Sequence, residues 1–462
     1  MSKTEHTLTE ADHLEHGLKV RHLTMMGLGS AIGAGLFLGS GVGIAAAGPA
    51  VIVSYVLAGI MIVFVMRMLG EMGAALPASG SFSHYARIGI GEWAGFTMGW
   101  LYWFMLIMVL GVEITGASAI VSSWLPGVPQ WVVALVFVTF FAVVNLAKVA
   151  NFGEFEFWFA ALKVAVIIAF LVIGVMLVFG LLPDTEPVGL THLLGDGDGF
   201  APNGLAGIAA GLLAVAFAFG GIEIVTIAAA ESRDPERSIA TAVRTVVWRI
   251  SLFYLGSISI MVLVLPWTSA SGETSPFVSV LDIAGLPYVS GFMELVVVIA
   301  LLSAFNANVY GTSRMAYSLA RGGDGPTVLA KLSRTGVPRN AVLLSVFFGF
   351  VSVLLNWWLP EDILGILLNA VGSALLAIWI FIVVSHLRLR PTLEQEGRLT
   401  VRMWAFPYLS WLTLAMLGAF IVLMLFDSAA RIQLASTAVL FLFIAAVSRL
   451  WQRRSRSRTA AR

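Results

Sequence analysis

Two clusters of small residues interrupt long apolar stretches of this chain and are its first candidates for chemistry. From Gly27 to Gly48 the sequence reads Gly-Leu-Gly-Ser-Ala-Ile-Gly-Ala-Gly-Leu-Phe-Leu-Gly-Ser-Gly-Val-Gly-Ile-Ala-Ala-Ala-Gly. The second cluster reads Phe217-Ala-Phe-Gly-Gly-Ile-Glu223. Glycine in a helix interior costs about 1 kcal/mol relative to alanine. The clusters therefore predict either broken helices or very close helix contacts.

A helix broken inside a membrane offers partial charges of both signs. The N–H groups that start one half lack intrahelical acceptors, and the C=O groups that end the other half lack donors. With the helix dipole, the N–H groups suit a carboxylate, and the carbonyl groups suit an ammonium. A zwitterion such as an amino acid matches both. Packing through small residues is the alternative explanation, and the presence of two matching clusters favours the binding site.

Three ionisable residues inside apolar stretches add to these candidates: Glu113, Lys163 and Glu223. Such residues are costly within a membrane and are functional candidates by default. Glu113 lies mid-stretch and suits a proton path. Lys163 lies roughly 10 Å inside its stretch at 1.5 Å per residue, where a snorkelling side chain is the alternative. Glu223 is equally well explained as an acceptor for amides freed by the second break.

The elements that position these residues are apolar runs, each near the roughly 20 residues that cross a bilayer. Twelve runs are predicted near 23–47, 49–69, 93–124, 129–148, 156–182, 203–230, 242–266, 288–317, 340–358, 362–386, 404–426 and 432–450. Gly48-Pro49 is a strong turn signal, so the first two runs are interpreted as separate helices rather than one long one. The interrupted runs are the first and the sixth, which is typical of a transporter site between two inverted repeats.

The placement of basic residues predicts the orientation. With the N-terminus in the cytoplasm, Arg431 is the one basic residue of 27 in an outward connection, and Lys163 is the one within a run. This follows the positive-inside rule. We therefore expect a cytoplasmic tail at 1–22, a transmembrane domain at 23–450 and a basic cytoplasmic tail at 451–462.

Composition excludes several other classes of protein. The chain is 59% hydrophobic and 11% charged, whereas soluble domains carry about 25% charged residues. Cysteine is absent, which excludes disulfides and thiolate metal sites. The histidines do not gather within the runs, and no phosphate-binding loop ending in Lys-Ser/Thr occurs. We expect no cofactor, no metal, no direct use of ATP and no nucleic-acid partner.

Four stretches of the sequence resemble bacterial amino acid permeases of the amino acid–polyamine–organocation superfamily, in its proton-driven branch. They are Gly17-Leu-Lys-Val-Arg-His22 leading into Ile32-Gly-Ala-Gly-Leu-Phe-Leu-Gly-Ser40; Met66-Arg-Met-Leu-Gly-Glu-Met72 with Gly80-Ser-Phe-Ser83; Gly153-Glu-Phe-Glu-Phe-Trp-Phe159 with Lys163; and Phe219-Gly-Gly-Ile-Glu223 through Ala228-Ala-Ala-Glu-Ser232. The resemblance covers essentially the whole chain. It implies an all-α membrane fold of two inverted five-helix repeats, with helices 1 and 6 broken, plus two C-terminal helices.

The resemblance also implies roles for individual residues. The substrate carboxylate would meet amides at Gly33, Ala34 and Gly35. The substrate amine would meet carbonyls near Ala31, Phe217 and Gly220. Phe219 corresponds to the aromatic gate over the substrate, and Lys163 to a family lysine whose ammonium takes the place of a sodium ion in related carriers. Glu113 matches an acidic position of the family.

Within the branch, the likeness is closest to gamma-aminobutyrate permeases, through Ile224–Ser232, Trp248–Tyr254 and Arg402–Trp404. Gly35 departs from the serine expected after Ala34, and permeases for aromatic and other neutral amino acids carry glycine there. The substrate therefore stays open between these classes.

The sequence predicts proton-coupled uptake of an amino acid across the bacterial inner membrane by alternating access, with gamma-aminobutyrate or another neutral amino acid as the first candidate cargo. An aromatic or other amino acid permease or exchanger of the same superfamily is one alternative. An ion channel is a more remote one, because it would need a symmetric pore or rings of carbonyl groups. An intramembrane enzyme is disfavoured, since the runs hold no clusters of histidine or acidic residues.

Overall fold

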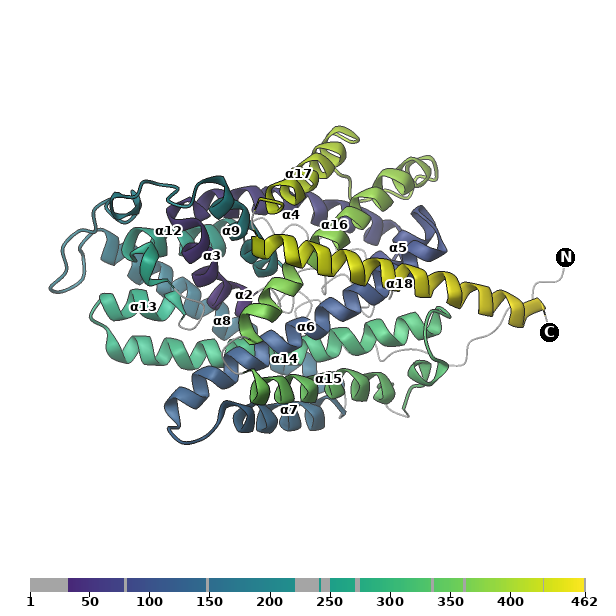
Figure 1. The fold of residues 1–462 in the computed structure, drawn as a ribbon, viewed down its shortest axis with the longest axis horizontal. Helices are drawn as coiled ribbons and strands as arrows, with labels where there is room; N and C mark the ends of the chain where they lie inside the picture. The colour runs from purple at the N-terminus through teal and green to yellow at the C-terminus, as the bar shows by residue number, and fades with distance from the viewer. Residues whose placement is uncertain are drawn as a thin grey trace.

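The computed structural model describes residues 32–78, 81–146, 149–220, 241, 250–270, 275–333, 336–359, 363–426 and 428–460. Across these ranges the chain is almost entirely helical, and none of their residues lies in a β-strand. Figure 1 shows an elongated bundle in which α14 and α18 run lengthwise.

The first half of the chain forms seven described α-helices. They are α2 (Ala34–Phe37), α3 (Gly39–Ala47), α4 (Val51–Ala75), α5 (Ser81–Gly89), α6 (Glu92–Trp124), α7 (Gln130–Leu146) and α8 (Val149–Val178). A 3₁₀ turn, Gly48–Ala50, separates α3 from α4, and Gly48 has φ +62°. The positive φ explains why glycine precedes the proline. The separation of the first two predicted runs is confirmed.

The second half repeats the pattern of long apolar helices. Its α-helices are α9 (Gly204–Ala218), α12 (Gly256–Val264), α13 (Pro276–Ile283), α14 (Pro287–Arg321), α15 (Arg339–Trp358), α16 (Ile363–Gln395), α17 (Tyr408–Met424) and α18 (Ser428–Ala460). A π-helical turn, Ile250–Leu255, leads into α12. Short 3₁₀ turns are found at Gly195–Gly197, Trp267–Ser269 and Thr327–Ala330.

In the part of the chain that the structure describes, every predicted run corresponds to a helical segment. Residues 23–31, 147–148, 221–230, 242–249 and 362 of the predicted runs lie outside the described residues. Within the described ranges seven segments are long and apolar enough to cross a membrane, and the first, Ala34–Ala75, contains the second run and residues 34–47 of the first. The other runs correspond to shorter apolar helices: Gln130–Leu146, Gly204–Ala218, Leu252–Val264 and Tyr408–Met424. The prediction of an all-α membrane protein with about twelve membrane crossings is confirmed. The thickness of a bilayer core, ~30 Å, sets the helix length that each crossing needs.

Several helices extend beyond their predicted runs, and these extensions matter for the site. Helix α4 continues to Ala75, α8 begins at Val149, and α16 continues to Gln395. Helix α18 continues to Ala460, through most of the predicted C-terminal tail, because neither glycine nor proline occurs from Ser428 onward. Hydropathy marks where apolar residues stop, whereas a helix stops only where its backbone hydrogen bonds do.

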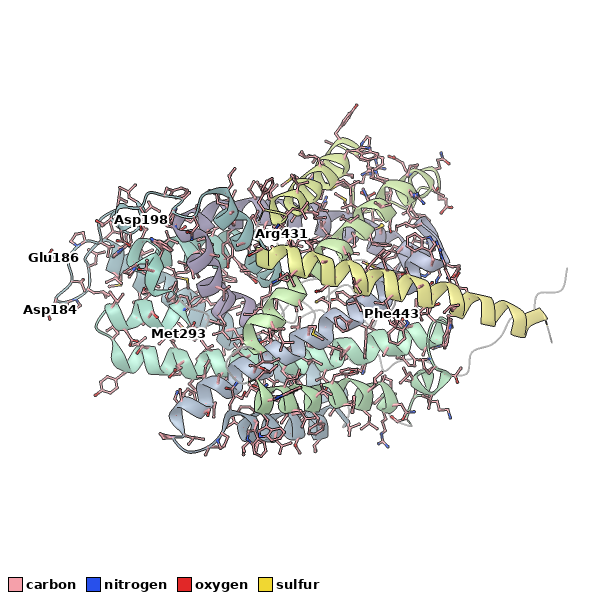
Figure 2. All side chains as sticks on the ribbon, in the orientation of Figure 1. Asp184, Glu186, Asp198, Met293, Arg431 and Phe443 are labelled. Carbon is pink, nitrogen blue, oxygen red and sulfur yellow. The ribbon has the colours of Figure 1, made fainter. Side chains whose placement is uncertain are left out.

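Helices α6 and α14 form the centre of the bundle. Most residues of α6 are buried, and α6 packs against α14, α16 and α5. Helix α3 lies along α9, and the short α2 contacts α9, α6 and α14. The acidic residues Asp184, Glu186 and Asp198 lie at the end of the molecule opposite the C-terminal end of α18 (Figure 2). The two interrupted segments thus meet inside the bundle, away from both ends.

Candidate functional site

The first predicted break lies at the start of α2. Gly33 is extended, with φ −144° and ψ −151°, and the helix begins at Ala34. The Ala34 N–H donates to both carboxylate oxygens of Glu113, Oε1 and Oε2, each at 3.1 Å. Glu113, on α6, is only 3% exposed. A buried carboxylate of the protein itself therefore binds one of the three amides assigned to the substrate.

Gly33 is needed for this approach. A Cβ atom at Gly33 would lie 2.5 Å from Glu113 Oε1 and 3.1 Å from the Ala304 Cβ of α14. Real Cβ contacts do not come as close as the first of these distances. The absence of a side chain at Gly33 therefore lets the carboxylate reach the helix start.

Gly35 joins the two interrupted segments. A Cβ atom there would lie 2.5 Å from Ala218 Cα and 3.2 Å from the Phe217 carbonyl oxygen at the end of α9. The two clusters of small residues thus meet, as the transporter interpretation expects. This close backbone contact also fits the alternative explanation, helix packing through small residues. The same glycine is therefore consistent with both the binding site and the helix packing.

The end of α9 is ordered by hydrogen bonds and aromatic contacts. The Gly220 N–H donates to the Phe217 carbonyl oxygen at 2.9 Å, which leaves that oxygen one lone pair for another donor. Phe219 is fully buried, and its ring centroid lies 4.8 Å from that of Tyr254 and 6.1 Å from that of Tyr55 on α4. The Tyr254 hydroxyl donates to the Ala218 carbonyl oxygen at 2.8 Å.

Lys163 lies behind the first break and is fully buried on α8. Its ammonium interacts electrostatically with the carboxylates of Glu156 and Glu113, and the interaction with Glu156 is the stronger. The alternative of a snorkelling side chain is therefore wrong for this conformation. We call Glu113, Lys163 and Glu156 the break cluster.

Glu156 is the member of the break cluster that the sequence reasoning missed. It is fully buried, and Ser303 Oγ of α14 donates to both of its carboxylate oxygens, each at 3.0 Å. The predicted run began at Glu156, which placed this residue at a membrane surface. Since α8 begins at Val149, Glu156 lies two turns inside the helix. Glu156 lies seven residues before Lys163, so both are on one face of the helix. This spacing was the sequence signal that could have identified Glu156.

A second set of buried charges, which we call the Glu71 cluster, consists of Glu71, His386 and Arg390. Arg390 Nη1 donates to Glu71 Oε2 at 3.0 Å, and His386 Nε2 lies 3.2 Å from Glu71 Oε1. The Met403 N–H also donates to Glu71 Oε2. Glu71 is 1% exposed. It was missed because the predicted run ended at 69, whereas α4 continues beyond it.

Two of the sequence candidates, Ala31 and Glu223, lie outside the described residues. The others form one connected arrangement. Gly33, Ala34 and Gly35 face Glu113 on one side and the end of α9 on the other, and Lys163 lies behind Glu113. Such an arrangement can bind an anion at backbone amides and can exchange a proton among two carboxylates and one amine. It contains no activated nucleophile.

The chain is similar to known amino acid carriers along almost its whole length. Residues 22–460 match the family model described as amino acid permease. The aromatic amino acid transport protein AroP of Corynebacterium glutamicum is 58% identical, covering 94% of each chain. The gamma-aminobutyric acid permease of Bacillus subtilis is 44% identical, covering 92% of this chain and 91% of its own. AroP of Escherichia coli K12 is 39% identical, covering 90% of each chain.

Proposed function

We propose that this chain, which belongs to the amino acid permease family, takes up aromatic amino acids by proton-coupled symport. Membership of the family makes it an amino acid transporter of the membrane and not an enzyme or a channel. Alternating access supplies the cycle, in which the bundle opens the site to one side at a time. The proposal has three parts: the cargo, the coupling and the orientation.

The cargo is proposed from the likeness to the relatives and from one residue. The relative named for aromatic amino acids is 58% identical, whereas the gamma-aminobutyric acid permease of B. subtilis is 44% identical. Gly35 agrees with this order, because the sequence resemblance associates glycine at that position with aromatic and other neutral substrates. The aromatic rings of Phe219, Tyr55 and Tyr254 next to the break suit an aromatic side chain.

The substrate's charged ends are proposed to use the backbone groups at the two interrupted segments. Glu113 already holds the Ala34 N–H, so an anion is chemically suited to this helix start. The substrate carboxylate binds beside it at Gly33 and Gly35, and the amine meets the carbonyl groups near Ala31, Phe217 and Gly220. Anchoring mostly by backbone groups requires both ends of the zwitterion.

The coupling is carried by one observation, the contact of the buried break cluster with the broken helix. Glu113 links Lys163 to the start of α2, and Glu156 links Lys163 to Ser303 on α14. A change in the protonation of Lys163 or Glu113 would change the attraction between α8, the α2 start and α14. Protons then favour one arrangement of these helices over the other.

The orientation is proposed from the basic residues. Inner-membrane insertion with both termini in the cytoplasm follows from the positive-inside rule. The chain's lack of cysteine makes this testable. Glu186→Cys should react with an impermeant thiol reagent from outside, and Lys331→Cys only after the membrane is opened. Reaction of both from one side would disprove the arrangement.

The decisive experiment on the cargo is uptake into proteoliposomes under an imposed pH gradient. Radiolabelled phenylalanine should accumulate, and tyrosine and tryptophan should compete, whereas gamma-aminobutyrate should compete at least tenfold more weakly. Phenylalanine methyl ester and N-acetylphenylalanine should not compete. Stronger competition by gamma-aminobutyrate would make it the cargo, which is the second candidate because of the 44% and 42% identical permeases for that substrate.

A further inference from the structure

Two adjoining cavities lie beneath α18, away from the break cluster. The first, of about 400 Å³, is bounded by α6, α18 and the segment 324–326. The second, of about 690 Å³, is bounded by α6, α16 and α18. Both are lined by Phe104 and Leu440, which stand between them. Both cavities are bounded partly by α18, which also packs against α6 and α16.

Hydrogen bonds at one end keep the first cavity from closing. Trp451 Nε1 of α18 donates to the Gly323 carbonyl oxygen at 2.7 Å. Trp100 Nε1 of α6 donates to the Asp324 carbonyl oxygen at 2.9 Å. These indoles tie both helices to the loop after α14, so α18 cannot slide toward α6 without breaking them.

The first cavity has the depth of one lipid leaflet. Its lining on α18 runs from Leu440 to Trp451, roughly 16 Å at 1.5 Å per residue. Half of a bilayer core of ~30 Å is about 15 Å. Phe443 lines the cavity yet is 65% exposed, so the cavity reaches the outer surface of the bundle beside it (Figure 2). An acyl chain can enter there from the surrounding bilayer.

The lining is apolar or aromatic except for Asp324 and the indole nitrogens. The Asp324 carboxylate is paired with Arg87, and the same guanidinium lies 3.1 Å from Glu92 Oε2. The Trp103 indole, 8% exposed, adds to the aromatic lining of the cavity.

The same end of α18 is rich in positive charge. Arg449 is exposed, and Arg453, Arg454, Arg456 and Arg458 follow it in the sequence. Clusters of basic residues at the end of a membrane helix attract anionic lipid headgroups. An apolar slot one leaflet deep and a basic helix end therefore match two parts of one molecule: an acyl chain and a phosphate.

We infer that this cavity is a binding site for an anionic phospholipid. One acyl chain lies between α6 and α18 against Phe104, Leu440 and Ile444. The headgroup lies at the basic end of α18. The site is separate from the transport path and does not depend on which amino acid is carried.

Native mass spectrometry of the full chain in mild detergent tests the inference, with phosphatidylglycerol and phosphatidylcholine of equal chain length as probes. The wild type should retain one phosphatidylglycerol and at least tenfold less phosphatidylcholine. Ile444→Trp, which fills the cavity, should lower this occupancy at least tenfold. Leu442→Trp, on the exposed face of the same helix, should leave it unchanged. Equal retention by both variants would overturn the proposal.

A milder variant tests the headgroup contact without disturbing the fold. Replacing Arg449, Arg453 and Arg454 by glutamine should remove the preference for phosphatidylglycerol over phosphatidylcholine. Inorganic phosphate in excess should not displace the lipid. An unchanged preference in the glutamine variant, or displacement by phosphate, would refute the headgroup assignment.

The other possible occupant is a second copy of the chain. Because cysteine is absent, Phe443→Cys offers a single reactive thiol at the cavity mouth. Phosphatidylglycerol should protect this thiol from a maleimide, and oxidation should not join two chains through it. A disulfide-linked dimer that carries no lipid would show that a second copy covers this face, and the lipid site would be wrong.

Discussion

The break cluster and the Glu71 cluster are both buried sets of charges, but they differ in what satisfies them. Glu71 is held by a guanidinium, an imidazole and a backbone N–H from α16 and the segment after it. In the break cluster, two carboxylates share one ammonium, and the other recorded donors are the Ala34 amide and the Ser303 hydroxyl. Within the described part of the chain, one cluster is matched in charge, whereas the other holds one more acidic than basic group.

The difference indicates which cluster can respond to protons. A buried pair with its charges matched and hydrogen-bonded is costly to disrupt, which suits a fixed joint between α4 and α16. Carboxylates that outnumber their buried cation can take up a proton without leaving an unpaired charge. The fixed joint and the proton-responsive contact are thus made from the same residue types. Four predictions follow, in order of their expected effect on transport.

Lys163→Ala should abolish accumulation driven by a pH gradient, because no cation then links Glu113 to Glu156. Substrate exchange between the two sides should persist, since exchange needs no net proton movement. Uptake into proteoliposomes with and without the gradient measures both. Lys331→Ala, at an exposed position, is the control. Gradient-driven accumulation by the Lys163 variant would transfer the coupling role to another group.

Gly33→Ala should lower gradient-driven uptake roughly tenfold or more, since a hydrogen bond to a charged group contributes ~1.5–3 kcal/mol. The added Cβ would lie 2.5 Å from Glu113 Oε1 and would push the carboxylate off the Ala34 amide. Initial rates per folded molecule are the measurement. Gly418→Ala, in α17 with open space around it, should behave as wild type. Normal uptake by Gly33→Ala would show that the Glu113 contact is dispensable.

Glu156→Gln should reduce the accumulation ratio by a smaller factor, about threefold, and shift the pH at which uptake is half-maximal. Glutamine keeps an acceptor for Ser303 but removes one of the two charges that face Lys163. Replacing the carboxylate by a neutral acceptor costs less free energy than leaving the Ser303 hydroxyl without an acceptor. The pH profile of uptake separates this positioning role from a loss of packing, which would lower the rate equally at every pH.

Glu71→Gln should leave the accumulation ratio unchanged while destabilising the protein. Removing one partner of a buried pair costs about 3–5 kcal/mol, because Arg390 is left without its carboxylate. Thermal unfolding in detergent measures the loss, and uptake normalised to folded protein measures the coupling. If the variant uncouples transport at normal stability, the contrast between the two clusters fails.

The sequence by itself determined the all-helical membrane fold and the number of crossings. Hydropathy, the Gly48-Pro49 turn and the two glycine clusters are local signals, and each reports its own stretch of chain. Glu113 and Lys163 were found in the same way, since a charge within an apolar run is visible without any knowledge of its neighbours.

Only the tertiary structure decided which groups meet. It placed Glu113 on the Ala34 amide, Gly35 against the backbone of Ala218, and Glu156 beside Lys163. Glu156 and Glu71 were missed because their helices run past the ends of the apolar runs. The physical reason is that the hydropathy of a segment reflects that segment's own contact with lipid, independently of the other segments. A buried carboxylate instead depends on donors from helices distant in sequence, and packing alone brings those donors to it.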